Sequence, residues 1–127
     1  MIDCAVDSSV LIATLRNKPR ALAALARWSS LAISHVAFGE LLFGVFKTSD
    51  PLELTKVSRL IDGMTILSGD DTTALHYATI RKQLENAGSV IPENDIWIAA
   101  AAMQVDVPLL ARDSHFSRIQ GLRVFSY

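Results

Sequence analysis

The sequence predicts an α/β fold whose central sheet of four to five strands is mainly parallel. Short apolar runs rich in β-branched residues alternate with longer segments in which apolar residues recur at helical spacing. Two of these runs, at 2–6 and 107–111, are followed closely by acidic residues, Asp7 and Asp113. Strands that alternate with helical segments pair in parallel through right-handed crossovers.

Length and composition indicate one domain over residues 1–127. The chain is 50% hydrophobic, which suits a sizeable core. Its net charge of −1 and pI of about 6.3 exclude a strongly basic surface, so phosphate groups would have to be bound locally. The single cysteine, Cys4, lies in an apolar run and is expected to be a buried structural thiol. No signal peptide or membrane span is apparent, so we expect a soluble cytoplasmic protein with no membrane association.

Capping residues and prolines mark the elements of the first half. Pro19 suits the first turn of a helix that runs to Trp28. Ser34 can cap the helix that follows it, and Asp50 can cap a helix whose first residue is Pro51. The expected elements are a strand over 2–6, helices from 8 and over 19–28, a strand over 31–34, and helices over 35–46 and from 51 to about 62.

Strands and helices are expected to alternate in the second half of the chain as well. Asp70 or Asp71 caps a long helix that stops at Gly88, and Glu93 or Asn94 is expected to cap the next one. The expected elements are strands over 64–67, 107–111 and 122–125 and helices from 71 to about 87 and over 94–104.

Four acidic residues are placed where this fold would bring them together. Asp7 and Asp113 leave the carboxyl ends of strands, whereas Glu40 and Asp95 lie early in helices. In a parallel sheet the carboxyl ends of the strands and the amino ends of the following helices share one edge, where ligands bind. We therefore expect all four carboxylates to converge on that edge.

Glu40 needs a partner. The helix over 35–46 is apolar nearly all round, so we expect it to be buried on more than one face. A carboxylate there would be costly unless it were paired. A metal ion would serve, as would a salt bridge to Arg16, Arg81 or Arg112, and the convergence with other acids favours the metal. Taken alone, Asp95 could simply complement its helix dipole, and Asp7 and Asp113 could be solvated loop residues.

Grouped carboxylates predict a metal-dependent nuclease. Like charges held close together repel, and Mg²⁺ or Mn²⁺ relieves that repulsion through the oxygen ligands it prefers. Such ions lower the pKa of bound water and stabilise the attacking and leaving oxygens at a phosphate. No histidine pair or cysteine cluster has zinc spacing; His35, His76 and His115 are interpreted as surface or supporting residues.

Five segments together resemble, in order and spacing, the signatures of PIN-domain ribonucleases of the VapC toxin type. The resemblance covers essentially the whole chain. It implies a three-layer α/β/α domain with an Mg²⁺ or Mn²⁺ pocket, and an endoribonuclease that leaves 5′-phosphate and 3′-hydroxyl ends on RNA. It also implies a homodimer and a cognate VapB-type antitoxin. The segments are 7–12, 40–44, 78–84, 94–100 and 112–116.

By matching position, the resemblance gives Asp7, Glu40, Asp95 and Asp113 the catalytic and metal-binding roles. Asp113 stands at the most variable of these positions. Ser9 matches a supporting position that is often Asn, Ser or Thr, and here a hydroxyl replaces the commoner amide.

Cationic residues expected near the same edge could contact RNA, although solvated surface charge is the better explanation of any single one of them. These residues are Arg16, Lys18, Arg20 and Arg112. The target RNA is left open, since nothing in the sequence distinguishes transfer, ribosomal and messenger RNA.

Two other classes of protein are alternatives. A PIN-like binding module without cleavage activity would differ in failing to bind Mg²⁺ or Mn²⁺. A phosphotransfer protein also places an aspartate after its first strand, but haloacid-type phosphatases need a second aspartate where Ser9 stands. The acidic pair of a receiver domain is not evident either.

Surplus apolar residues in the helix over 35–46 favour dimerisation. Phe38, Leu42, Phe43 and Phe46 exceed what one small sheet is expected to cover. We therefore expect a homodimer.

Overall fold

Five parallel strands form the central sheet of the computed structural model, which describes all residues from 1 to 127. The strand order is β3-β2-β1-β4-β5, and every pairing between neighbours is parallel. The predicted fold class is therefore confirmed. The strands are β1 (Cys4–Val6), β2 (Leu31–Ser34), β3 (Thr65–Leu67), β4 (Leu109–Leu110) and β5 (Val124–Phe125).

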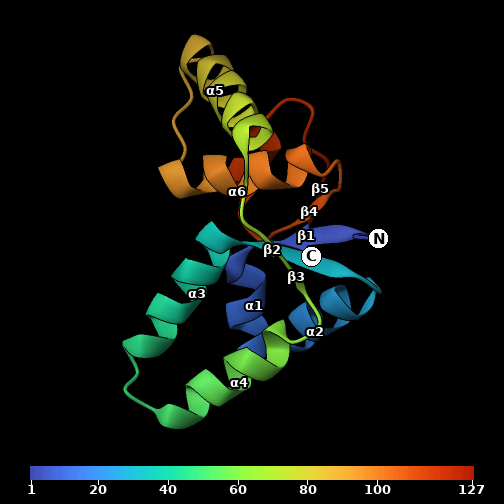
Figure 1. The fold of residues 1–127 in the computed structure, drawn as a ribbon, viewed down its shortest axis with the longest axis vertical. Coiled ribbons are helices and arrows are strands. Elements are labelled where there is room, and N and C mark those ends of the chain that lie inside the picture. Colours follow the sequence, from blue (N-terminus) through green and yellow to red (C-terminus); the bar gives the residue numbers. More distant parts are fainter.

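Helices cover both faces of the sheet (Figure 1). On one face lie α1 (Ser8–Leu15), α2 (Pro19–Ala26), α3 (His35–Phe46) and α4 (Pro51–Ile61). On the other lie α5 (Asp71–Asn86) and α6 (Glu93–Gln104), and a 3₁₀ helix, η1 (Ser114–Arg118), follows β4. This is the three-layer arrangement that the resemblance implied. None of the helices combines the length and apolar composition that crossing a membrane requires.

The core lies between the sheet and both helical layers. Leu11, Ile33, Ile98 and Phe116 are fully buried in one cluster that also contains residues of β1 and β4. The alanine run of α6 is buried as well, which lets this helix pack closely on the sheet. Cys4 has no exposed surface, and burial raises the pKa of its thiol to about 11, so the predicted buried cysteine is confirmed.

Most predicted helix starts are found. Ser34 accepts a hydrogen bond from the backbone N–H of Ala37 at 3.0 Å, and Asp50 caps α4 from its predicted position. Of the two candidates for α5, Asp70 is the cap, with its carboxylate 3.1 Å from the N–H of Thr73.

The prediction that the second helix runs to Trp28 was wrong, because α2 ends at Ala26. The carboxylate of Asp3 accepts hydrogen bonds from Ser29 Oγ at 2.7 Å and from the Ser30 N–H at 3.1 Å. These bonds hold the turn that leads into β2, and they give Asp3 a structural role that the sequence did not suggest.

The predicted cap of α6 was also wrong. Pro92 occupies the N-cap position and makes no side-chain capping bond. Glu93 and Asn94 lie in the first turn, where their side chains bind residues of other helices: Glu93 pairs with Arg81, and Asn94 binds Glu40.

Helix α3 is buried on one face only, contrary to expectation. Ala37, Leu41 and Val45 form its buried face. Phe43 and Phe46 are 64% and 65% exposed, so its opposite face is apolar but open to solvent. The apolar sequence of α3 therefore reflects a surface without a partner in the monomer, rather than a helix enclosed by the core.

Candidate metal centre

Asp7 is fixed where β1 meets α1. Its backbone N–H donates to the carbonyl of Leu110 at 3.0 Å, which ties it to β4. Its carboxylate caps α1 and accepts a hydrogen bond from Ser9 Oγ at 2.6 Å. Only 4% of Asp7 is exposed. Burial raises the pKa of its carboxyl, nearby Asp95 and Glu40 raise it further, and the bonds from Ser9 oppose the shift.

Glu40, on α3, is held by two neutral donors. Its Oε1 accepts from Ser8 Oγ at 3.0 Å and its Oε2 from Asn94 Nδ2 at 3.3 Å. The alternative of a salt bridge was wrong, since none of the ion pairs in the structure involves Glu40. Arg81 instead pairs with Glu85 and Glu93.

Asp95 lies in the first turn of α6 with 14% of its side chain exposed. Burial is the largest effect and raises the pKa of its carboxyl. A hydrogen bond from His115 opposes this shift, whereas the charges of Asp113 and Glu40 add to it. A buried carboxyl whose pKa is raised by neighbouring acids is typical of functional sites.

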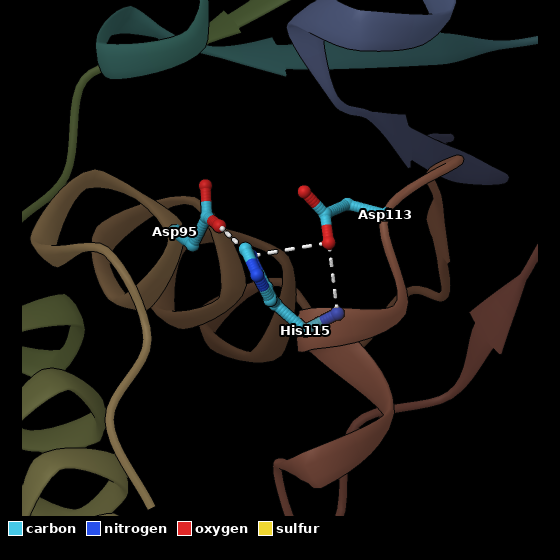
Figure 2. A group of neighbouring side chains, drawn as sticks. All are labelled: Asp95, Asp113 and His115. Carbon is cyan, nitrogen blue, oxygen red and sulfur yellow. Dashed lines mark hydrogen bonds and ion pairs between the residues drawn. The ribbon is translucent and has the colours of Figure 1, made fainter.

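Asp113 and His115 complete the cluster (Figure 2). Asp113 caps η1, and its Oδ1 accepts from the backbone N–H of His115 at 3.0 Å. The imidazole of His115 lies between two carboxylates, with Nδ1 3.2 Å from Asp95 Oδ2 and 3.1 Å from Asp113 Oδ1. One ligand atom from each of these three residues lies within 4.8 Å of the others.

The structure thus brings all four acids to the carboxyl edge of the sheet. The charges of Asp95 and Glu40 act on Asp7, and those of Asp113 and Glu40 act on Asp95. No lysine or arginine forms an ion pair with any of the four acids. Like charges that converge without a cationic partner leave a negative potential that a divalent cation would neutralise. The oxygen ligands present suit a hard dication.

Of the cationic residues expected near the acids, Arg112 is adjacent in sequence to one of them, Asp113. Its guanidinium lies over the Tyr127 ring, 5.9 Å from the centroid. Arg16 caps the far end of α1, about 12 Å from Asp7 along a helix of eight residues. Lys18 lies beyond it, at the N-cap of α2.

Two residues of the site, Ser8 and Asn94, were not identified from the sequence, whereas the supporting role open to His115 is found. Ser8 and Asn94 hold Glu40, and His115 contacts both Asp95 and Asp113. His115 had been interpreted as a surface or supporting residue, and its place two residues after Asp113 was the available signal. For Ser8 and Asn94 the sequence carried no signal, because their partner lies on a different helix.

Comparison with known proteins agrees with this architecture. The PIN domain pattern matches residues 4–122, which is most of the chain. The chain therefore belongs to the PIN-domain family.

Its relatives within that family are VapC ribonucleases. Ribonuclease VapC5 of Mycobacterium tuberculosis is 30% identical over 91% of this chain and 87% of its own length. The tRNA(fMet)-specific endonuclease VapC of Salmonella typhimurium is 27% identical over 98% of this chain and 97% of its own length. The crystal structure of DNA-bound VapBC from Salmonella typhimurium matches with a TM-score of 0.90 and 26% identity, covering 99% of this chain and 98% of that one.

Proposed function

We propose that this protein is a metal-dependent endoribonuclease toxin of the VapC type, which hydrolyses phosphodiester bonds in RNA. The observation that carries the proposal is the convergence of Asp7, Glu40, Asp95 and Asp113 without a lysine or arginine partner. The ribonuclease and endonuclease relatives support the same activity.

The donor set fits Mg²⁺ or Mn²⁺. Asp7, Glu40, Asp95 and Asp113 would hold the ion or ions through carboxylate oxygens, the ligands that both cations accept. When bound, such an ion supplies a water nucleophile at neutral pH and stabilises negative charge at the phosphate.

The residues of the chain prepare the site in advance. Ser9 fixes the carboxylate of Asp7, and Ser8 and Asn94 fix both oxygens of Glu40. Because these donors are neutral, they orient the carboxylates while leaving their charge available for a cation. We include Arg112, which is exposed and directly precedes Asp113, in the proposal as a contact for an RNA phosphate.

The test is cleavage of a mixed RNA pool by antitoxin-free protein with Mg²⁺, Mn²⁺ or EDTA. Asp7→Asn is the site variant, and Asp71→Asn, an exposed change in the first turn of α5, is the matched control. We expect metal-dependent cuts with the parent and the control but none with Asp7→Asn. Absence of both cuts and metal binding would instead favour a PIN-like module that only binds.

We further propose that a VapB-type antitoxin binds along α3. A cavity of about 270 Å³ lies between α1, α3 and α4, and its lining includes Ile12, Leu15 and Leu41. Phe43 and Phe46 are exposed on α3. The lining also includes the charged residues Arg16, Lys47 and Glu53, so the cavity offers both apolar and charged contacts to a helical or extended segment of a partner. The structural relative from Salmonella typhimurium is itself a VapBC complex.

The predicted homodimer stays a proposal. It is supported by the same exposed side chains of α3, and the mass of the chain in solution without antitoxin tests it. A mass of two chains would support the dimer, and a mass of one chain at micromolar concentration would contradict it.

A further inference from the structure

We propose that His115 is a direct metal ligand through Nδ1, together with Asp95 and Asp113, and that this mixed nitrogen and oxygen set makes the site prefer Mn²⁺ to Mg²⁺. The inference rests on the proposed nuclease function. It adds a residue and an ion preference that the four acids alone do not supply.

The spacing of the three donors matches a coordination sphere. Nδ1 lies 3.1 Å from Asp113 Oδ1 and 3.2 Å from Asp95 Oδ2. Two ligands that occupy adjacent octahedral positions at about 2.1 Å from an ion lie about 3 Å apart. A cation can therefore lie between the imidazole nitrogen and the two carboxylates, which already face one another (Figure 2).

The backbone holds this geometry in place. The N–H of His115 donates to the same Asp113 oxygen that faces its ring, so the two donors belong to one turn at the start of η1. The next residue, Phe116, is fully buried and anchors that turn to the core. The imidazole is thus positioned by the turn that carries it and by its two carboxylate neighbours.

The chemistry of the donors sets the ion preference. Mg²⁺ is a hard ion that takes oxygen ligands and keeps several waters, so an imidazole contributes little to its binding. Transition-metal dications accept imidazole nitrogen readily, and Mn²⁺ also accepts carboxylate oxygen. A site with one nitrogen and two carboxylates therefore discriminates in favour of Mn²⁺.

Pulsed electron paramagnetic resonance of the Mn²⁺-loaded protein tests this directly. We expect nitrogen modulation from a coordinated imidazole, and its pattern should change when the protein is labelled with ¹⁵N-histidine. Bound Mn²⁺ that shows no histidine coupling would overturn the proposal, and this result needs no variant that might fail to fold.

Calorimetry provides the second measurement. His115→Gln should weaken Mn²⁺ binding by at least about tenfold and change Mg²⁺ binding much less. The matched control is His76→Gln, since His76 lines a different cavity with Met103 and Leu122. Unchanged or tighter Mn²⁺ binding by His115→Gln would overturn the proposal.

The outcomes also separate this inference from the proposed function. If Asp95→Asn abolishes Mn²⁺ binding and RNA cleavage while His115→Gln retains the Mn²⁺ preference, His115 is not a ligand and the nuclease assignment stands. If the parent protein binds neither ion and cuts no RNA, both proposals are wrong.

Discussion

The side-chain amide of Asn94 donates to the carboxylate of Glu40 at 3.3 Å, across 54 residues of sequence. This bond joins α6 to α3 at the edge of the acid cluster. The other oxygen of Glu40 is held by Ser8, so the carboxylate is fixed by two neutral groups. Neutral donors orient a ligand without competing with a cation for its charge.

Removing either donor should therefore loosen Glu40. We expect Asn94→Ala and Ser8→Ala each to weaken Mn²⁺ binding by about 10- to 100-fold, the usual cost of losing a supporting hydrogen bond at a metal site. Titration calorimetry measures the effect. Asn86→Ala, at the exposed end of α5, is the control. Equal affinities in all four proteins would mean that Glu40 does not contribute to binding.

Replacing Asp7 or Asp95 by asparagine should reduce RNA cleavage by at least about a hundredfold, or about 2.7 kcal/mol of transition-state stabilisation. The reason is that each change removes a negative charge from the centre of the cluster while keeping the shape of the side chain. Initial rates on one defined RNA at saturating Mn²⁺ provide the measurement. If cleavage survives both changes, the nuclease site lies elsewhere.

Asp7→Asn should lower cleavage, as above, but it should raise the stability of the metal-free protein. The pKa of Asp7 is raised above its usual 3.8 in the folded state, so between 3.8 and the raised pKa the folded protein binds more protons than the unfolded chain. The free energy of unfolding therefore falls as pH rises through this window and stays lower at neutral pH. Asp7→Asn removes that penalty, and asparagine caps α1 equally well.

We accordingly expect Asp7→Asn to melt a few degrees above the parent protein in EDTA at pH 7, measured by calorimetry. The difference should disappear below pH 3.8, where both side chains are uncharged, and saturating Mn²⁺ should diminish it at pH 7. A lower melting temperature for the variant at pH 7 would contradict the destabilising charge of Asp7.

The exposed face of α3 should be needed for association and not for folding. Phe43→Ser and Phe46→Ser change side chains that are about two-thirds exposed, so each should alter the free energy of unfolding by about 0.5 kcal/mol or less. Binding of the antitoxin, measured by calorimetry, should weaken by about 2 kcal/mol for a central contact. Leu75→Ser on α5, with 66% exposure, is the matched control. Unimpaired binding by both phenylalanine variants would place the partner elsewhere.

Local signals predicted most of the fold. Ser34 and Asp50 cap α3 and α4 from their predicted positions, because a cap depends on residues within one turn. The end of α2 was missed, since it depends on bonds between Asp3 and the turn at Ser29 and Ser30, which is distant in sequence.

The residues of the candidate site were also predicted only in part. The acids could be placed at one edge because strand ends share that edge in a parallel sheet. The partners of Glu40 could not be predicted, since Ser8 and Asn94 reach it from two other helices. The burial of α3 on more than one face was predicted wrongly, because an apolar sequence does not tell a core-facing surface from a partner-facing one. The surplus apolar side chains of this helix were recognised, and Phe43 among them is exposed.

The position of β1 between β2 and β4 affects when activity can arise. The amide of Asp7 binds the carbonyl of Leu110, and Asp95 and Asp113 belong to the last third of the chain. A nascent chain that is only three-quarters synthesised has Asp7 and Glu40 but no strand to hold Asp7 and no Asp113. Under the proposed function, cleavage would therefore begin only once β4 and Asp113 have been synthesised, because the acid cluster is incomplete before then.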